Sequence, residues 1–345
     1  MHVKKGGGAV YFPRESVLQE KMRKGVIQLT SAILLAVLLG CSITVAADGM
    51  VRIGITQIVE HPALDAARDG FIAELAEYGY DESKVVYDVQ NAQGDFATAQ
   101  AIAEKFVNGS VDLILAIATP TAQATANVTQ RIPILITAVT DPVAAELVES
   151  IKRPGTNVTG TSDLTPVAKQ MDLLKTITPS AQRVGVLYNP GETNSLVQLE
   201  LAREAAASLG LKVVEAPVSN SSSVYQSAQS LIGRVDAIYV PTDNTVVSAL
   251  ESVVMVAEAA KLPLIVGETD SVKRGGLATV SIDYYSLGRQ TGRMALDILE
   301  NGSDPSTMPI QYMEDVEIVL NLQAAQRIGV SLSPELIQQA DQLIE

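Results

Sequence analysis

The chain has 345 residues, of which 47% are hydrophobic and 19% charged, so it is long enough for about two domains with packed cores. The formal net charge of −14 disfavours nucleic-acid binding, because an acidic surface repels phosphate groups. Cys41 is the only cysteine, and the histidines are His2 and His61, so we expect no intrachain disulfide, no thiolate–imidazole metal site and no cofactor.

The first 47 residues have the pattern of an export segment. Residues 21–24 are a short basic run, and residues 26–39 are almost entirely apolar. This apolar stretch is shorter than the roughly 20 residues that a membrane span needs. A basic flank followed by a short apolar stretch is typical of a secretory signal, which starts at either Met1 or Met22.

Two processing routes are compatible with this segment. Residues 38–41 resemble a lipobox, in which Cys41 would be lipidated and would become the mature N-terminus. The small residues at 44–47 resemble an ordinary signal-peptidase site instead. The mature protein is therefore expected to be periplasmic, or lipid-anchored on the outer side of the cytoplasmic membrane, with no other membrane contact.

From Val51 onward, β-rich runs alternate with helical patterns. In the amphipathic segment 62–78, apolar residues recur at helical spacing, and Gly79 predicts its end. The first half is predicted to contain strands at 51–56, 85–89, 111–116 and 133–137, and helices at 62–78, 96–107 and 121–128. Continuously apolar strands alternating with helices indicate a parallel sheet that is covered on both faces.

The same plan then begins again. Residues 183–187 resemble 52–55, residues 235–239 resemble 111–115, and residues 262–266 resemble 132–136. The near-constant offset predicts two copies of one α/β plan, that is, two Rossmann-like lobes with parallel sheets. The turn-forming residues around 157–161 predict the first crossing between the lobes. Two further crossings are expected near 282–284 and 309–311. The first lobe would then comprise 48–157 and about 284–308, and the second lobe 161–282 and about 310–345.

Ligands of open parallel sheets bind beyond the carboxyl ends of the strands. Polar residues at those positions are therefore the candidate ligand contacts. In the first copy they are Gln57, Glu60, His61, Thr119, Pro120, Thr121, Thr140, Asp141 and, in the hinge, Thr161. In the second copy they are Tyr188, Asn189, Asn194, Asp243, Asn244 and Glu268, with Thr242 beside them.

The two copies differ chemically at these positions. Thr119 and Thr121 open a helix, where hydroxyls and free backbone N–H groups suit a carboxylate. The second copy offers the carboxylates of Asp243 and Glu268. One lobe would hold an anion and the other a cation, as a zwitterionic amino acid requires.

Each candidate also has a purely structural interpretation. Asp243 and Thr121 could simply cap their helices, and His61 before Pro62 could be a surface residue that caps the first helix. Asp141 could mark only a helix start. Tyr188, Tyr284 and Tyr285 could line an apolar pocket or belong to the core or surface.

Several ordered segments resemble one family. Residues 57–65, 141–143, 154–160, 188–190 and 240–244 resemble the solute-binding components of ABC importers, in particular the TrpX-like (tryptophan/tyrosine-type) group. The resemblance covers about residues 50 to 345. It implies a type I periplasmic-binding-protein fold, two Rossmann-like lobes joined by a three-crossover hinge that closes on a ligand.

The resemblance also implies a function and partners. We expect a monomer that binds an amino acid or an analogue, aromatic ones included, and delivers it to an ABC permease and its ATPase. An enzyme is disfavoured, since no activated nucleophile, acid–base pair or phosphate loop stands out. The alternative that remains is a sensor of the same fold that presents its closed state to a membrane receptor.

Overall fold

The computed structural model describes His2, Gly6 and residues 49–345. The predicted signal, both cleavage sites and Cys41 lie outside the described residues. In the part of the chain that is described, no helix has both the length and the apolar composition needed to cross a membrane.

The first lobe is built on a six-stranded sheet with the order β11-β5-β4-β3-β1-β2. Its strands are β1 (Val51–Gln57), β2 (Val85–Asn91), β3 (Leu113–Ile117), β4 (Ile134–Val139), β5 (Val158–Ser162) and β11 (Gln311–Tyr312). All neighbouring strands run parallel; for example, Ile53 of β1 pairs with Leu113 of β3. Strands β3, β4 and β5 are buried along their whole length, as their continuous apolar or small-residue sequences predict.

The second lobe repeats this plan in a seven-stranded sheet with the order β13-β12-β10-β9-β8-β6-β7. Its strands are β6 (Arg183–Tyr188), β7 (Lys212–Pro217), β8 (Ala237–Val240), β9 (Leu264–Val266), β10 (Ala278–Ser281), β12 (Glu317–Asn321) and β13 (Gln342–Ile344). Only β12 is antiparallel to its neighbour β10. Counted within each copy, the first five strands of both sheets have the order 2-1-3-4-5, so the duplication inferred from sequence is present in the topology.

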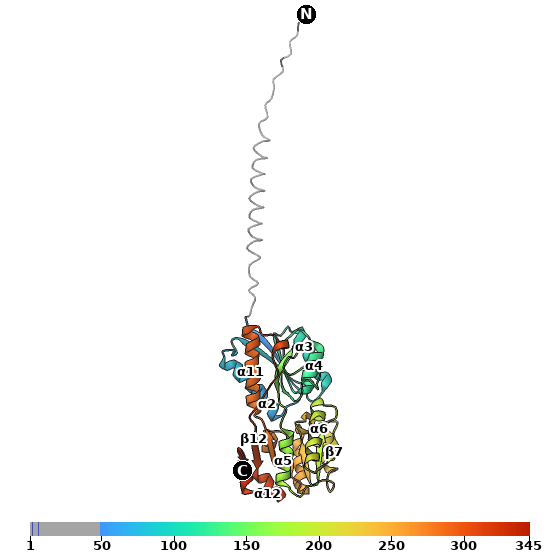
Figure 1. Ribbon diagram of the computed structural model, residues 1–345. Helices are drawn as coiled ribbons and strands as arrows, with labels where there is room; N and C mark the ends of the chain where they lie inside the picture. The colour runs from blue at the N-terminus through green and yellow to red at the C-terminus, as the bar shows by residue number, and fades with distance from the viewer. Residues whose placement is uncertain (1, 3–5, 7–48) are drawn as a thin grey trace. The chain divides into compact units, whose positions relative to one another are not determined.

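Helices cover the sheets in pairs (Figure 1). In the first lobe, α2 packs on α11 and α3 packs on α4, whereas in the second lobe α5 packs on α6 and α7 on α9. The first-lobe helices are α2 (Pro62–Glu77), α3 (Phe96–Asn108), α4 (Thr119–Val128) and α11 (Tyr284–Asn301), with the 3-10 turn η2 (Pro305–Thr307). Those of the second lobe are α5 (Val167–Ile177), α6 (Thr193–Ser208), α7 (Val224–Gln229), α8 (Asn244–Val247), α9 (Leu250–Ala260), α10 (Thr269–Lys273), α12 (Leu322–Ile328) and α13 (Pro334–Gln339), with η1 (Ser221–Ser223).

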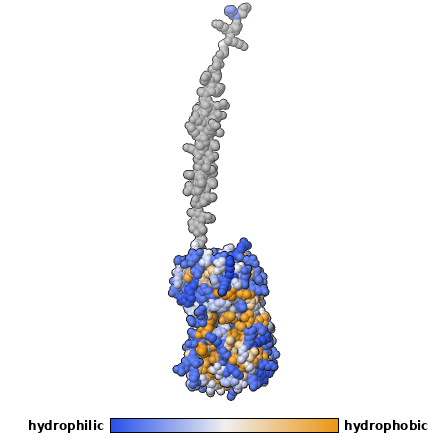
Figure 2. Space-filling model, viewed as in Figure 1, coloured by the Kyte–Doolittle hydropathy of each residue, from blue (hydrophilic) through white to orange (hydrophobic). Residues whose placement is uncertain are grey.

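Each lobe has its own hydrophobic core. Phe71 and Phe106 are fully buried against the first sheet, and Tyr239 is fully buried in the second lobe. Hydrophilic residues cover much of the face drawn in Figure 2, with hydrophobic residues gathered towards its middle. The lobes are thus two separately packed bodies within one folded unit, residues 50–345.

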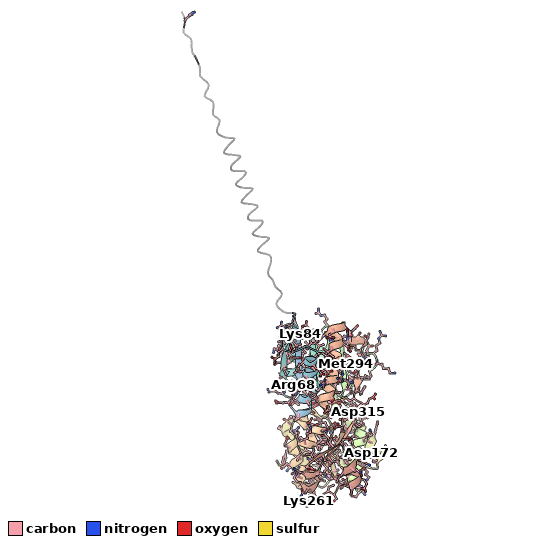
Figure 3. All side chains as sticks on the ribbon, turned by 90° about the vertical axis from the view of Figure 1, so that its left-hand side faces the viewer. Arg68, Lys84, Asp172, Lys261, Met294 and Asp315 are labelled. Atoms are coloured by element: carbon pink, nitrogen blue, oxygen red, sulfur yellow. The ribbon has the colours of Figure 1, made fainter. Side chains whose placement is uncertain are left out.

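Three segments connect the lobes: 163–166, 282–283 and 313–316. Figure 3 shows Asp315, in the third crossing, at the junction of the two lobes. The first and third crossings lie later in the chain than the sequence predicted. Residues 158–162 still pair with β4, and Gln311 still pairs with Thr161, so both predicted positions belong to the first sheet.

Candidate functional site

A narrow cavity, here called the interlobe cavity, lies where strand ends of the two sheets face each other. Its free volume is about 10 Å³, close to the minimum for one water molecule. A solute of amino-acid size would enter it only if side chains or lobes move apart. The first lobe and its crossings contribute His61, Leu64, Ala138, Thr140, Asp163 and Tyr284, and the second lobe contributes Asn194, Thr242, Asp243, Asn244, Val247 and Glu268.

Several residues proposed from sequence come together here. They are His61, Thr140, Asn194, Asp243, Asn244 and Glu268, joined by Thr242 and Tyr284. Each lies just after a strand or at the start of a helix, where the parallel-sheet rule places ligand contacts.

Two candidates from the loop after β1 lie outside the cavity. Gln57 is buried, and its amide donates to the carbonyl of Val59 at 2.8 Å and to Asp65 at 2.9 Å. It therefore holds the loop before α2 rather than facing the cavity. Glu60 is exposed.

Two candidates at strand ends, Thr161 and Tyr188, do not line the interlobe cavity. The hydroxyl of Thr161 lies 2.7 Å from that of Thr291 on α11, inside the first lobe. The hydroxyl of Tyr188 donates to Glu215 on β7 at 2.8 Å. Alternate residues of a strand face opposite sides of the sheet, so a strand-end position does not by itself decide which way a side chain faces.

The start of α4 is a partly unsatisfied helix end. The hydroxyl of Thr121 donates to the carbonyls of Ile117 and Ala118, so it is used locally. The hydroxyl of Thr119 is buried and has no hydrogen-bond partner among the described residues. Ala118 adopts φ 81° and ψ 155°, a region that glycine normally occupies, and its side chain cannot cap the helix.

Asp141 and Asn189 hold turns at the edge of the site. Asp141 accepts from the backbone N–H groups of Val143 and Ala144, at 2.9 and 3.0 Å, in a turn and not in a helix. The amide of Asn189 donates to the hydroxyl of Thr245 at 2.8 Å. Neither side chain lines the interlobe cavity.

Four of the lining residues were not among the candidates proposed from sequence. Asp163 follows β5 directly, so the rule used for the other strands would have found it had 157–161 not been taken as the hinge. Leu64 and Val247 lie in the first turns of α2 and α8, where no polar signal marks them. Ala138 lies beside an irregularity in the β4–β5 register, which no sequence pattern predicted.

The first-lobe wall contains a buried acidic network. Asp163 accepts from the hydroxyl of Thr140 at 3.1 Å and from that of Tyr284 at 2.7 Å. Burial raises the pKa of Asp163, while these hydrogen bonds act in the opposite direction. The network joins the ends of β4 and β5 to the start of α11, so it links two crossings to the cavity.

The second-lobe wall contains two more buried carboxyl groups. Asp243 accepts from the backbone of Val246 at 2.7 Å, from the hydroxyl of Ser195 at 2.6 Å and from the backbone of Asn189 at 2.5 Å. Burial, and secondly the charge of Glu192, raise the pKa of Asp243 to about 7. Asp243 thus caps α8, as one interpretation of the sequence proposed, and also lines the cavity.

Glu268 caps α10 in the same way. Its carboxylate accepts from the backbone N–H of Ser271 at 3.0 Å, and burial raises its pKa. Burial therefore raises the pKa of three carboxyl groups that line the cavity. Such a wall accepts hydrogen bonds and would be stabilised by a cationic donor.

His61 is a buried part of the first-lobe wall. Its side chain makes no capping hydrogen bond to α2, so the expectation of a surface helix cap was wrong. Burial, and secondly the charge of Arg274, lower the pKa of His61 to about 3. The imidazole is therefore neutral at neutral pH, and its Nδ1 atom has no partner among the described residues.

No group of three or more potential metal ligands is found in the described part of the chain. The arrangement of acceptors around a narrow space instead suits recognition of a polar, hydrogen-bond-donating solute.

A second hollow, the interlobe groove, adjoins the cavity and shares Asn244 with it. Its volume is about 360 Å³, and both lobes line it. Its first-lobe wall includes Ile58, Phe96 and Pro120, and its second-lobe wall includes Asn189 and Glu192. The groove therefore lies beside the cavity, between the two lobes.

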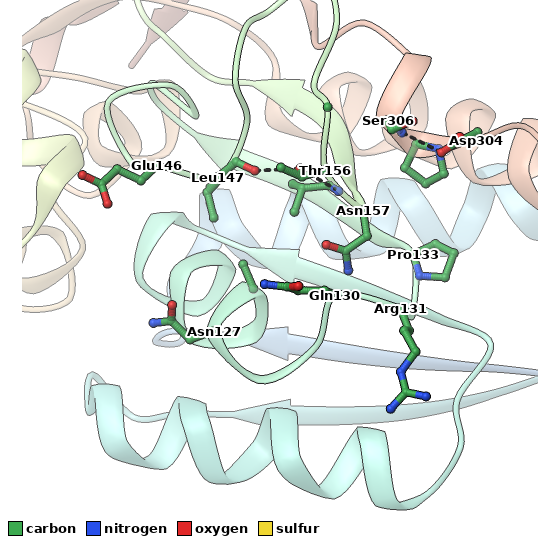
Figure 4. Close-up of a pocket in the computed structure, with 14 residues that line it drawn as sticks. Asn127, Gln130, Arg131, Pro133, Glu146, Leu147, Thr156, Asn157, Asp304 and Ser306 are labelled. Atoms are coloured by element: carbon green, nitrogen blue, oxygen red, sulfur yellow. Dashed lines mark hydrogen bonds between the residues drawn. The ribbon is translucent and has the colours of Figure 1, made fainter.

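A larger hollow of about 650 Å³ lies elsewhere on the first lobe (Figure 4). Arg131, Glu146 and Asp304 are among its lining residues, and it adjoins the amino ends of β4 and β5. It draws residues from one lobe only and lies at the edge of the sheet opposite the ligand-binding edge. It is therefore not the candidate solute site.

Two of the known proteins that this chain resembles have names that state a ligand. The chain is 47% identical over 271 residues to a tyrosine-binding protein of Clostridioides difficile (strain R20291), which covers 78% of each chain. A domain from Streptococcus pneumoniae in complex with L-Trp has a TM-score of 0.83 at 36% identity, over 86% of this chain and 100% of that one.

The comparisons also indicate the arrangement of the lobes. A ligand-free, open structure of a substrate binding protein with adhesive properties from Clostridium difficile is 45% identical, over 86% of this chain and 99% of that one. Its TM-score is nevertheless only 0.65. The less identical L-Trp complex superposes better, so the lobes of this chain are arranged more like those of the complex than like those of the open structure.

The fold and the family agree. Solved ABC transporter solute binding proteins at 18% identity or less share this two-lobed fold, that of the type I periplasmic binding proteins. Proteins of this kind bind solutes outside the cytoplasm and do not transform them. The family model for ABC transporter substrate binding proteins matches residues 52–344, and the chain belongs to that family.

Proposed function

We propose that this protein binds an aromatic amino acid, L-tyrosine or L-tryptophan, and delivers it to the permease of an ABC importer. The observation that carries the proposal is the interlobe cavity, in which buried hydrogen-bond acceptors of both lobes face one another. The names of the two relatives, a tyrosine-binding protein and an L-Trp complex, narrow the solute to this class.

Each part of an amino acid has a chemically suitable partner near the cavity. The ammonium group would lie among the buried acceptors, Asp163, Asp243 and Glu268 included. The carboxylate would lie at the start of α4, where the Thr119 hydroxyl is unpartnered and the helix dipole favours an anion. Leu64 and Val247 would contact the apolar side chain.

Binding would work by stabilising the closed arrangement. Ligand contacts made by both lobes favour the closed form by the difference in affinity between the two forms. The three crossings, 163–166, 282–283 and 313–316, would take up the change in angle. A permease would then distinguish the loaded protein by its closed shape.

The alternative, a sensor that presents its closed state to a receptor, is not favoured. The matching family model and the solved relatives are described as transporter components. Reconstitution with the cognate permease and ATPase separates the two functions, since only the importer component stimulates uptake of labelled solute.

We also propose that the protein is an exported monomer, either tethered to the membrane through a lipidated Cys41 or released by ordinary signal-peptide cleavage. Mass spectrometry of the mature N-terminus distinguishes the two processing routes. A lipidated Cys41 gives a diacylglyceryl-modified N-terminus that partitions into detergent, whereas ordinary secretion gives an unmodified N-terminus at residue 47 or 48. Size-exclusion chromatography with light scattering tests the monomer.

A thermal-shift screen of the purified protein against the twenty amino acids tests the proposed ligand, followed by calorimetry. A ligand at 100 times its Kd stabilises the folded state by about 2.7 kcal/mol. For a protein of this size that corresponds to a rise in Tm of several degrees. The proposal predicts this rise for L-tyrosine or L-tryptophan. Equal responses to all amino acids, or a response only to sugars, would contradict it.

A further inference from the structure

Three buried carboxyl groups line the interlobe cavity, and they differ in the groups that donate hydrogen bonds to them. Asp163, Asp243 and Glu268 are each no more than 3% exposed. A carboxylate has about four acceptor positions on its two oxygens, so one whose positions are already occupied has little left for a solute. The donors around each group therefore indicate which one is available to a cation.

Asp243 is occupied by the second lobe itself. Its Oδ1 accepts from the backbone N–H of Val246, and its Oδ2 accepts from the backbone N–H of Asn189 and from the hydroxyl of Ser195. The two backbone donors are fixed by the start of α8 and by the loop after β6, so they cannot turn away to admit a solute.

Glu268 is occupied by the first turn of α10. Both of its oxygens lie 3.0 Å from the backbone nitrogen of Ser271, and Oε1 also accepts from the Ser271 hydroxyl. This is the arrangement of a helix N-cap. Glu268, like Asp243, therefore serves mainly to satisfy donors of the fold.

Asp163 differs from both, because it caps no helix. It lies shortly before Pro166, which is the N-cap of α5. Its Oδ1 accepts from the hydroxyl of Thr140 at 3.1 Å, and its Oδ2 accepts from the hydroxyl of Tyr284 at 2.7 Å. Because each oxygen has two lone pairs, both can accept from a further donor.

Asp163 also has no cation beside it. Among the described residues, no basic side chain contributes to the pKa of this carboxyl group, which burial raises. Burying a carboxylate without a counter-ion is unfavourable, so a cation that enters the cavity is stabilised there. A ligand with an ammonium group supplies such a cation.

Tyr284 and Thr140 hold this carboxylate from two directions. Thr140 follows β4 and Tyr284 begins α11, and both are buried and line the cavity. One hydroxyl on each oxygen restrains the rotation of the carboxylate. An acceptor that is ordered before the ligand arrives loses little side-chain freedom on binding.

We propose that Asp163 is the counter-ion of the ligand's ammonium group. Tyr284 and Thr140 are its positioning residues, while Asp243 and Glu268 hold the starts of α8 and α10. The inference rests on the proposed function, because it assigns the amine of the amino acid to one carboxylate of the cavity wall. It predicts that a solute without an amine binds weakly, since such a solute leaves Asp163 buried without a cation.

Calorimetry with L-tyrosine and its desamino analogue, 3-(4-hydroxyphenyl)propanoate, tests this assignment. The two solutes differ only in the amine, so the ratio of their Kd values measures the amine preference. Asp163→Asn keeps the shape of the side chain but removes its charge. We expect its Kd for L-tyrosine to rise about tenfold or more, and its Kd for the analogue to stay the same or fall. Asp172→Asn, the same change at an exposed position on α5, should retain the wild-type preference.

Tyr284→Phe tests the positioning role. It removes the hydroxyl that donates to Oδ2 of Asp163 but leaves the carboxylate in place. We expect the amine preference to narrow by about twofold to tenfold. A purely structural role would instead raise both Kd values by the same factor. An unchanged preference removes the positioning role and, where Asp163→Asn does not fold, overturns the whole proposal.

Asp243→Asn and Glu268→Gln, measured in the same way, decide between the three carboxyl groups. They are expected to raise both Kd values together, because a disturbed helix start affects the cavity whichever solute is bound. The proposal is wrong if Asp163→Asn keeps the wild-type preference. It is also wrong if either of the other two variants narrows the preference as much as Asp163→Asn does.

Failure of the proposed function gives a different result. If the wild type binds a different amino acid, the aromatic assignment fails, and the same variants decide the role of Asp163 with that amino acid and its desamino analogue. If the wild type binds L-tyrosine and Asp163→Asn keeps the preference, the proposed function stands and the role of Asp163 is refuted. A wild type that binds no amino acid overturns both.

Discussion

Asp243 shows how one buried carboxylate can serve both the fold and the site. The sequence offered Asp243 either as a ligand contact or as the cap of a helix. In the structure its oxygens accept from Val246, Ser195 and Asn189, so it also joins the loops after β6 and β8.

Asp243→Ala is therefore expected to lower the free energy of unfolding as well as ligand affinity. The substitution leaves two buried donors, Val246 N–H and the Ser195 hydroxyl, and the part-buried N–H of Asn189 without their acceptor. Each buried donor left without an acceptor costs about 1–3 kcal/mol. We expect a total loss of about 2–4 kcal/mol after local relaxation, measured by urea unfolding. Asp172→Ala, at an exposed position on α5, should change stability by no more than about 0.5 kcal/mol. If Asp243→Ala loses no more stability than Asp172→Ala does, Asp243 does not hold the loops after β6 and β8 together.

His61 predicts how ligand affinity depends on pH. Its pKa is about 3 when buried between closed lobes and about 6.5 when exposed. Below pH 6.5 the open form carries a proton that closing must release, so this residue weakens closing as pH falls. The penalty grows by about tenfold per pH unit. Asp163, Asp243 and Glu268 have raised pKa values and act in the opposite direction. The charge of Arg274 contributes to lowering the pKa of His61.

Comparison with His61→Gln isolates the contribution of the imidazole. Between pH 7 and 5, wild-type affinity should fall relative to that of the variant by about tenfold to thirtyfold. Calorimetry at both pH values gives the change in Kd between pH 7 and pH 5 for each protein. A loss of affinity in the variant that is the same at both pH values cancels in this comparison. Parallel pH profiles would show that His61 does not titrate on opening.

The sequence could locate the neighbourhood of the site but not the direction of each side chain. Placing polar residues after strands identified His61, Asn194, Asp243 and Glu268, because parallel strands end at one edge of the sheet. It misplaced Tyr188 and Thr161, since a shift of one residue along a strand moves a side chain to the other face. Their partners, Glu215 and Thr291, are distant in sequence.

Helices α2 and α11 show how an element far along the chain positions the site. They pack closely because glycines face backbone: a Cβ at Gly288 would lie 1.9 Å from the carbonyl oxygen of Ala67. A Cβ at Gly70 would lie 2.1 Å from the carbonyl of Tyr285. This contact fixes the start of α11, where Tyr284 reaches Asp163.

Gly288→Ala is expected to destabilise the protein by about 1–3 kcal/mol, although alanine is the better helix former. The added methyl group must push α11 away from α2, because backbone cannot yield as a flexible side chain can. Thermal and urea unfolding measure the loss. Gly109→Ala, in a right-handed conformation with no contact closer than 3.2 Å, is the control and should be nearly neutral. Equal stability of both variants would contradict close helix packing.

The main elements followed from hydrophobic periodicity, but the crossings did not. The helix predicted at 62–78 is found at Pro62–Glu77, and the buried strands are found close to their expected positions. Residues 157–161 read as a turn because of their glycine and asparagine. They form a strand since Gly160, at φ 138°, lets β5 approach β4, where a Cβ would lie 2.1 Å from the Ile136 oxygen. Such pairing is a long-range property that local composition does not reveal.

The two lobes hold one another closed through contacts outside the ligand cavity as well. The amide of Gln123 on α4 donates to the carbonyl of Ala145 at 3.2 Å and to the hydroxyl of Thr193 on α6 at 3.4 Å. The second of these bonds joins the lobes and would break when they open. It therefore favours closing without discriminating between ligands.

Removing this bond should lower the affinity for every ligand by the same factor. Thr193→Val and Gln123→Ala each remove a hydrogen bond worth about 0.5–1.5 kcal/mol, which corresponds to roughly a twofold to tenfold rise in Kd. The double variant should lose little more than either single one, because both act on one contact. Calorimetry should show the same fold rise in Kd for L-tyrosine as for L-tryptophan. Small-angle scattering of the ligand-free variants should show a more open protein than the wild type. A factor that differs between the two ligands would place Gln123 in ligand recognition instead of in closure.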